Sequence, residues 1–357
     1  MNIMASYSSW GGLKMHAQKY LLTDVLKGEM GFNGFLVTDW EAIDQIDKND
    51  FYKSVVASIN AGIDMNMVPF KYQRYIDTLT QAVNNGDVSQ ERIDDAVRRI
   101  LRVKIMMGVF EQPFCDEPLS VMGCEAHRAL AREAVSQSLT LLKNEAALPF
   151  SKESSGLLVA GAHAHDVGLQ CGGWTIHWMG APGAITPGTT ILEGIQAVAG
   201  DTAEIAYDSA GQFGETRAPL GFVVVGEEPY AEGMGDRTDL HLPAEQVEMI
   251  RRVRQNCDKL VVMVLSGRPV IVSDWVDEVD GFIAGWLPGT EGDGVTDVLF
   301  GQYSFTGKTP YTWPRSIEQL PFDFNNLPQD GCDAPLFPYG YGLTQDETVA
   351  IDTLTCP

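Results

Sequence analysis

Three uninterrupted apolar runs in the second half of the chain most constrain its fold. They are Phe222–Val225, Leu260–Leu265 and Gly281–Ala284. We expect helices between and after them, at 243–257 and 290–300. A strand that is apolar at every position is covered on both faces, which is typical of a parallel sheet between helices. We therefore expect an α/β fold with a mostly parallel sheet in this part of the chain.

Weaker patterns extend this second region towards the N-terminus. We expect helices at about 126–141 and 189–199, a short strand at 157–160 and a weaker strand near 203–207. Gly and Pro residues punctuate the stretch before it, so we interpret 109–125 as a linker, 126–345 as the α/β domain and 346–357 as a tail.

The first region alternates strand and helix patterns as well. We expect strands at 2–7, 34–38 and 63–68, and helices at 17–29, 51–61, 69–84 and from Ser89 onwards. Three strands cannot close a (β/α)8 barrel, so we interpret 1–108 as the last three β/α units of a larger TIM-type barrel. The chain opens inside a strand pattern without a signal peptide, which favours a fragment or a late start site.

Asp39 is the first candidate functional residue. It stands where the strand 34–38 ends, and Trp40 follows it. Catalytic groups collect at the carboxyl ends of parallel strands, and an indole packs well on the apolar face of a sugar. A carboxylate beside an indole therefore suggests a sugar site; the alternative is that Asp39 caps the next helix.

A second carboxylate could come from the loop Gly226–Asp236. Four acids lie within it: Glu227, Glu228, Glu232 and Asp236. Glycoside cleavage needs two carboxyl groups, one ionised and one protonated. One hypothesis is that a Glu of this loop projects across a domain boundary towards Asp39; the alternative is a solvated acidic turn.

A Gly-rich stretch, Gln170–Trp178, carries two indoles, Trp174 and Trp178. Either could form an aromatic wall for a sugar, or both could belong to the core.

Composition excludes several classes of partner. The net charge of −23 makes nucleic acid and anionic membranes poor partners, and no apolar run is long enough to span a bilayer. The six His residues have no metal-ligand spacing and no nucleotide-binding Gly motif occurs, so we expect neither a metal nor a cofactor. Six Cys are dispersed; Cys115 and Cys124 could pair or remain free thiols.

Several motifs together resemble glycoside hydrolase family 3. They are Met4–Trp10, Gly34–Trp40, Ala61–Met67, Ser138–Asn144, Gln170–Trp178, Gly226–Asp236, Ser266–Val270, Trp286–Gly292 and Phe337–Leu343. The chain is most similar to the β-glucosidase and exo-β-glucanase branch. The resemblance implies a TIM-type barrel followed by an α/β sandwich, and removal of glucose from non-reducing ends with retention.

The resemblance also implies roles for particular residues. Asp39 corresponds to the nucleophile and Glu232 to the acid/base, Trp40 and Trp178 would enclose the second sugar ring, and Tyr7 would lie near the first. The expected partner is a β-glucoside or β-gluco-oligosaccharide, without a cofactor, in a possible homo-oligomer. The family suggests a periplasmic or secreted location.

The chain also departs from the family pattern. The Lys-His pair and the upstream Asp and Arg that hold the first glucose have no counterpart, and Gln45 stands where branch members often carry Arg. An alternative is therefore an inactive remnant that acts as a carbohydrate-binding or scaffold module. A separately encoded partner could also complete the barrel, and the N-acetylglucosaminidase branch is less similar because its acid/base loop would precede this chain.

Overall fold

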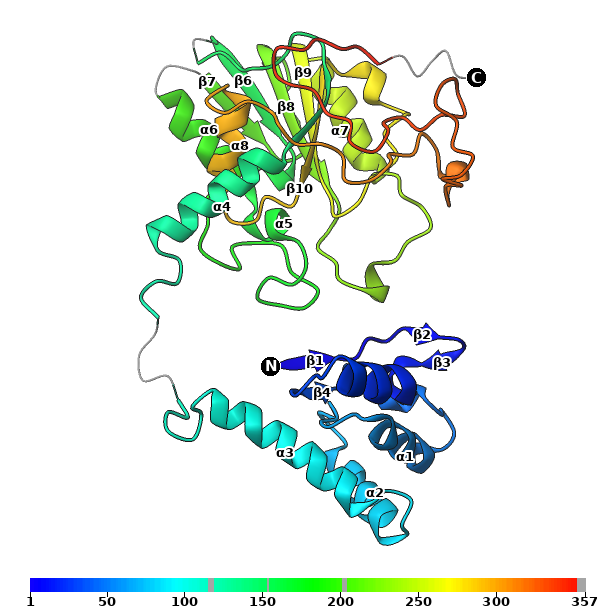
Figure 1. The fold of residues 1–357 in the computed structure, drawn as a ribbon. Helices are drawn as coiled ribbons and strands as arrows, with labels where there is room; N and C mark the ends of the chain where they lie inside the picture. The colour runs from blue at the N-terminus through cyan, green and yellow to red at the C-terminus, as the bar shows by residue number, and fades with distance from the viewer. Residues whose placement is uncertain (115–118, 153, 201–203, 352–357) are drawn as a thin grey trace. The chain divides into compact units, whose positions relative to one another are not determined.

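The computed structural model describes residues 1–114, 119–152, 154–200 and 204–351. The chain divides into two compact units, Met1–Leu119 and Ser120–Pro357 (Figure 1).

The first unit is built on a short parallel ladder. Strand β1 (Asn2–Met4) pairs with β4 (Phe35–Val37). Beside this ladder lie a small antiparallel pair and several helices: β2 (Ser9–Trp10), β3 (Leu13–Lys14), a π-helix (Tyr20–Glu29), α1 (Phe51–Ala61), α2 (Tyr72–Asn84) and α3 (Gln90–Met106).

The helix boundaries follow the local sequence signals in two cases. The side chain of Asp50 accepts a hydrogen bond from the Lys53 amide at the start of α1, and Gly62, with φ of 111°, ends that helix. The Ser89 side chain likewise accepts from the Arg92 amide at the start of α3. The predicted helix from Pro69 was placed too early, because α2 begins at Tyr72.

The predicted third strand at 63–68 is not a strand in the structure. Only Met65 forms a bridge, parallel to Val37. The Leu36 amide donates instead to the Asp64 side chain at 2.8 Å, so a carboxylate takes a donor that a continuous ladder would have used. The described residues of this unit form no closed barrel, and the TIM-type barrel stays a prediction.

The second unit contains the predicted sheet. Its six strands lie in the order β5-β10-β9-β8-β6-β7, and only β5 runs antiparallel to its neighbour. The strands are β5 (Thr140–Asn144), β6 (Gly156–Ala160), β7 (Glu204–Asp208), β8 (Ala218–Gly226), β9 (Cys257–Leu265) and β10 (Gly281–Trp286). The predicted α/β architecture with a mostly parallel sheet is confirmed for this unit.

Helices cover both faces of this sheet. On one face, Phe222 and Met263 pack in a core with α4 (Glu125–Ser138), α6 (Ile191–Ala199) and α8 (Gly292–Leu299). On the other face lies α7 (Ala244–Arg254), as Figure 1 shows. Val223 and Val262 pack there with residues of α7 and with the buried Trp275 and Trp313. Successive strand residues therefore face opposite layers, which explains why the strands are apolar throughout.

Two elements of this unit differ from the sequence prediction. The helix predicted at 126–141 ends at Ser138, and Thr140–Asn144 forms β5, a buried edge strand paired with β10. A short helix, α5 (Val167–Cys171), lies in the stretch predicted as a Gly-rich loop.

The structure also bears on the cysteines and on membrane and metal binding. Cys124, Cys171 and Cys257 are free, so Cys124 does not pair with Cys115, which lies with Cys356 outside the described residues. Cys332 is disulfide-bonded. Within the described ranges, no helix is long and apolar enough to cross a membrane, and no group of His, Cys, Asp or Glu could hold a metal ion.

Candidate active site

Asp39 lies two residues after the end of β4, separated from it by Thr38, close to where its sequence pattern places it. Its carboxylate accepts a hydrogen bond from the Trp40 amide at 2.7 Å, and its carbonyl oxygen accepts from the Ala42 amide at 3.3 Å. The next helical turn begins at Ala42, and its N-cap position, Glu41, makes no side-chain cap bond. Asp39 is therefore not the N-cap residue of that turn.

His16 holds the backbone at Asp39. The Asp39 amide donates to His16 Nε2 at 3.1 Å. Burial lowers the pKa of His16, although a backbone hydrogen bond at Ala5 and the charge of Asp39 act in the opposite direction. An imidazole that accepts at Nε2 must lack a proton there, so the direction of the pKa shift and the hydrogen bond agree.

Tyr7 and Trp40 lie beside this arrangement. The Tyr7 hydroxyl donates to the Trp40 carbonyl oxygen, and the Tyr7 ring meets the His16 ring edge-on with centroids 6.1 Å apart. The exposed Trp40 ring packs edge-on against Phe70 at 5.8 Å. The structure thus brings Tyr7, Asp39 and Trp40 together within the first unit.

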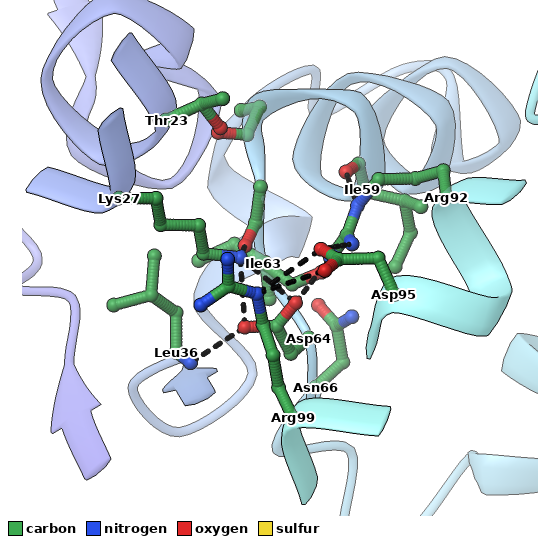
Figure 2. Close-up of polar contacts among 12 residues, drawn as sticks. Thr23, Lys27, Leu36, Ile59, Ile63, Asp64, Asn66, Arg92, Asp95 and Arg99 are labelled. Carbon is green, nitrogen blue, oxygen red and sulfur yellow. Dashed lines mark hydrogen bonds and ion pairs between the residues drawn. The ribbon is translucent and has the colours of Figure 1, made fainter. Parts of the chain in front are cut away.

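A buried ion network holds β4, the strand that precedes Asp39 (Figure 2). The Asp64 side chain is 0% exposed and accepts from Lys27 Nζ at 2.8 Å, from the Arg92 guanidinium and from the Leu36 amide. Arg92 also donates to the carbonyl oxygens of Ile59 and Ile63. Since Leu36 lies in the middle of β4, this network anchors β4 to the segment after α1.

The second predicted carboxylate, Glu232, lies in the second unit on an exposed loop after β8. Its φ of 29° is positive, a backbone conformation that residues with a side chain rarely adopt. The Gly235 amide donates to the Glu232 carbonyl oxygen at 2.6 Å, which closes a tight turn. We call residues 226–237 the Glu232 loop.

The loop that carries Trp178 packs against the Glu232 loop. A side chain at Gly173 would lie 2.0 Å from the Tyr230 carbonyl oxygen, so the two backbones pass very close. The Trp174 amide donates to the Trp178 carbonyl oxygen at 2.9 Å. Both tryptophans are exposed. Neither belongs to the core, which leaves both available for contact with a ligand.

Sequence reasoning assigned no role to His16, to Arg268 or to the Asp64 network, and it named Glu227 only as one of four acids in its loop. Arg268 forms an ion pair at 2.9 Å with the buried Glu227, which lies near the start of the Glu232 loop. A single His carries no spacing signal, and the pairing of Glu227 with Arg268 joins two strand ends that are distant in sequence. The four acids of the Glu232 loop are the one local feature consistent with a cation nearby.

Matches to protein families cover most of the chain. Residues 1–103 match the glycosyl hydrolase family 3 N-terminal domain, and residues 139–345 match the family 3 C-terminal domain. A periplasmic β-glucosidase of Salmonella typhimurium is 29% identical over 99% of this chain and 54% of its own length. A lysosomal β-glucosidase of Dictyostelium discoideum is 29% identical over 96% of this chain and 45% of its own length.

Solved structures agree with these matches. A mutant of an exo-1,3/1,4-β-glucanase from a Pseudoalteromonas species is 38% identical, with a TM-score of 0.87 over 99% of this chain and 59% of that one. A β-glucosidase from Listeria innocua in complex with glucose is 26% identical, with a TM-score of 0.83 over 96% of this chain and 51% of that one. The chain therefore spans about half the length of the curated relatives it matches. With both domains matched in order along its length, this chain belongs to glycosyl hydrolase family 3.

Proposed function

We propose that the chain takes part in the hydrolysis of O-glycosyl bonds, as a retaining, exo-acting β-glucosidase or exo-β-glucanase. The observation that carries this proposal is Asp39, a carboxylate at the end of β4 in a chain that matches both family domains. Relatives named as β-glucosidases and an exo-glucanase support the reaction class. They do not favour the alternative of a non-enzymatic carbohydrate-binding or scaffold module.

In this proposal, Asp39 attacks the anomeric carbon and Glu232 supplies a proton. The bond from the anomeric carbon to the leaving oxygen breaks, the oxygen keeps the electron pair, and the Glu232 proton goes to that oxygen. A covalent bond forms between an Asp39 oxygen and the sugar. Glu232, now ionised, then takes a proton from a water that attacks the anomeric carbon and releases Asp39.

The exposed aromatic groups supply sugar-binding surface in the same proposal. Trp40 and Trp178 would stack on the second sugar ring, and Tyr7 would contact the first, because flat rings pack on the C–H faces of sugars. The proposed substrate is a β-glucoside or β-gluco-oligosaccharide, and the glucose complex of the Listeria innocua relative supports this class. A periplasmic or secreted location and a homo-oligomer remain predictions.

The test is hydrolysis of an aryl β-glucoside by the full chain and its variants. Asp39→Asn should abolish turnover, and Glu232→Gln should lower kcat/KM for a poor leaving group by ~10²- to 10⁴-fold. Asp44→Asn, an exposed acid five residues after Asp39, and Asp236→Asn, an exposed acid of the Glu232 loop, serve as matched controls and should retain activity.

Three results would contradict the proposal. Equal hydrolysis by the chain and by Asp39→Asn would remove Asp39 from the nucleophile role. Release of α-glucose as the first product, followed by NMR, would exclude retention. No hydrolysis by the unaltered chain would show that this chain is not a glycosidase by itself.

A further inference from the structure

The Glu232 loop has a conformation that its own sequence does not favour. Glu232 has a positive φ of 29°, and Met234 between two glycines is exposed. Such a backbone persists only where surrounding contacts over-determine it. The contacts that hold this loop therefore bear on the proposed chemistry, because a general acid must be placed accurately to protonate a leaving oxygen.

Arg268 joins the two ends of this loop. It lies in the turn after β9, and its Nε lies 3.1 Å from both carboxylate oxygens of Glu227, near the start of the loop. Its Nη2 donates to the Gly235 carbonyl oxygen at 2.8 Å, near the end of the loop. One guanidinium thus links residues 227 and 235, and Glu232 lies between them.

The link is largely protected from solvent. The side chain of Glu227 is 5% exposed and that of Arg268 is 23% exposed. A second cation, Arg237, reaches the same carboxylate, with Nη1 3.2 Å from Glu227 Oε1. Charge-assisted hydrogen bonds in such surroundings are strong and directional, and the planar fork of Arg suits a carboxylate in a way that Lys cannot copy.

Tyr230 fills the space between these groups. Its ring lies under the Arg268 guanidinium at 4.2 Å, which is a cation–π contact. A side chain at Gly235 would lie 2.5 Å from the Tyr230 ring, and one at Gly267 would lie 2.7 Å from its hydroxyl. Burial and the Glu227 carboxylate raise the pKa of Tyr230 to about 12, so the phenol stays neutral beside the ion pair.

We infer that Arg268 is a positioning residue for Glu232: it holds the Glu232 loop closed through Glu227, Tyr230 and Gly235. The inference rests on the proposed role of Glu232 as the acid/base. Arg268 does not itself contact the reacting atoms in this scheme. It acts by restricting where the Glu232 carboxyl group lies, so its loss should affect steps that need the proton of Glu232 more than steps that do not.

Leaving groups of different basicity separate these two kinds of step. Breakage of a bond to 2,4-dinitrophenolate needs little protonation, whereas breakage of a bond to phenolate or to a second sugar needs a proton from the acid. Glu232→Ala should therefore retain kcat/KM on the dinitrophenyl β-glucoside within about threefold, and lose ~10²-fold or more on phenyl β-glucoside.

Arg268→Lys and Arg268→Ala are then compared with that benchmark in the full chain. Both should reproduce the pattern, with a loss of ~10-fold or more on the phenyl substrate and little on the dinitrophenyl one. Lys keeps the charge but cannot hold Glu227 and Gly235 together, so a purely electrostatic role would be rescued by Lys, and a positioning role would not. Arg251→Ala is the matched control, because Arg251 forms an exposed ion pair with Glu278 at 2.9 Å.

Amide hydrogen exchange of peptides covering 228–236 gives a second measurement that does not depend on turnover. Arg268→Lys should increase exchange in this loop at least tenfold while the exchange of β8 and β9 is unchanged, and Arg251→Ala should leave the loop unchanged. Unaltered loop exchange, or equal losses on both substrates in a folded Arg268→Lys variant, would overturn the inference. If Glu232→Ala itself shows no leaving-group dependence, the acid/base proposal fails instead, while loop exchange still decides whether Arg268 holds the loop.

Discussion

Asp64→Asn is the substitution for which the structure gives the firmest expectation. The side chain is 0% exposed and is the shared acceptor of two cationic side chains and of the Leu36 amide (Figure 2). Asn has nearly the same shape, but it carries no charge and presents a donor where an acceptor is needed. Lys27 and Arg92 are 6% and 15% exposed, so the variant leaves Lys27 buried without an anion and Arg92 with only the half-exposed Asp95.

The size of the effect follows from what remains around these cations. Removing one partner of a buried ion pair costs about 3–5 kcal/mol. Lys27 keeps a hydrogen bond of 2.6 Å to the Gly62 carbonyl oxygen, and Arg92 keeps Asp95 at 2.7 Å. These contacts offset part of the loss, so we expect the first unit to be destabilised by ~3 kcal/mol, or roughly two orders of magnitude in its opening equilibrium.

Hydrogen exchange in the full chain measures this locally. Peptides covering 35–38 and 59–67 should exchange roughly 100-fold faster in Asp64→Asn, whereas peptides of β8 and β9 should be unaffected. Asp95→Asn is the matched control: Asp95 pairs with Arg92 and Arg99 but is 44% exposed, so its loss should cost at most about 1 kcal/mol. Adding Lys27→Met to Asp64→Asn should recover part of the loss. An Asp64→Asn cost no larger than that of Asp95→Asn would refute the reasoning.

Two further predictions concern the second unit. Burial lowers the pKa of His163 below its usual 6.5, so the unfolded chain binds the proton first, and stability should fall as the pH drops below about 6.5 until the folded-state pKa is reached. His163→Gln should reduce that slope by up to ~1.4 kcal/mol per pH unit in urea titrations, and an unchanged slope would contradict this role. Gly161→Ala should cost ~3 kcal/mol or more, because the new Cβ would lie 2.0 Å from the Val224 carbonyl oxygen at a φ of +96°. Gly183→Ala, at a φ of +100° in open space, should cost only ~1–2 kcal/mol when both glycine variants are measured by urea titration, and equal costs would show that the close contact is unimportant.

The α/β fold of the second unit could be predicted because its strands are covered on both faces. Leu260–Leu265 is apolar at each position, and in the structure its residues alternate between the two cores. Strand β5 was missed because the predicted helix ran on to residue 141, and β5 is defined by its pairing with β10, which is distant in sequence. Residues 63–68 were predicted as a strand but do not form one, because the Leu36 amide donates to the Asp64 carboxylate where a continuous ladder would have used that amide.

For the candidate site as well, some features could be predicted from the sequence and others could not. The positions of Asp39 and Glu232 after strands could be read locally, because strand ends and Gly-rich turns are encoded by adjacent residues. Their catalytic roles remain proposals. The supporting residues could not be found in this way, since His16 reaches Asp39 across 23 residues and Arg268 reaches Glu227 across 41.

What the amino-acid sequence determined alone is thus the alternation of strands and helices, the family, and the placing of a carboxylate where β4 ends. Local periodicity and chain-adjacent signals suffice for these, because they depend on neighbouring residues. The tertiary structure decided which polar groups share a buried carboxylate: Lys27, Arg92 and the Leu36 amide at Asp64, and Arg268 and Arg237 at Glu227. The physical reason is that a buried charge is stable only beside partners of opposite charge, and the folded chain brings those partners from distant segments.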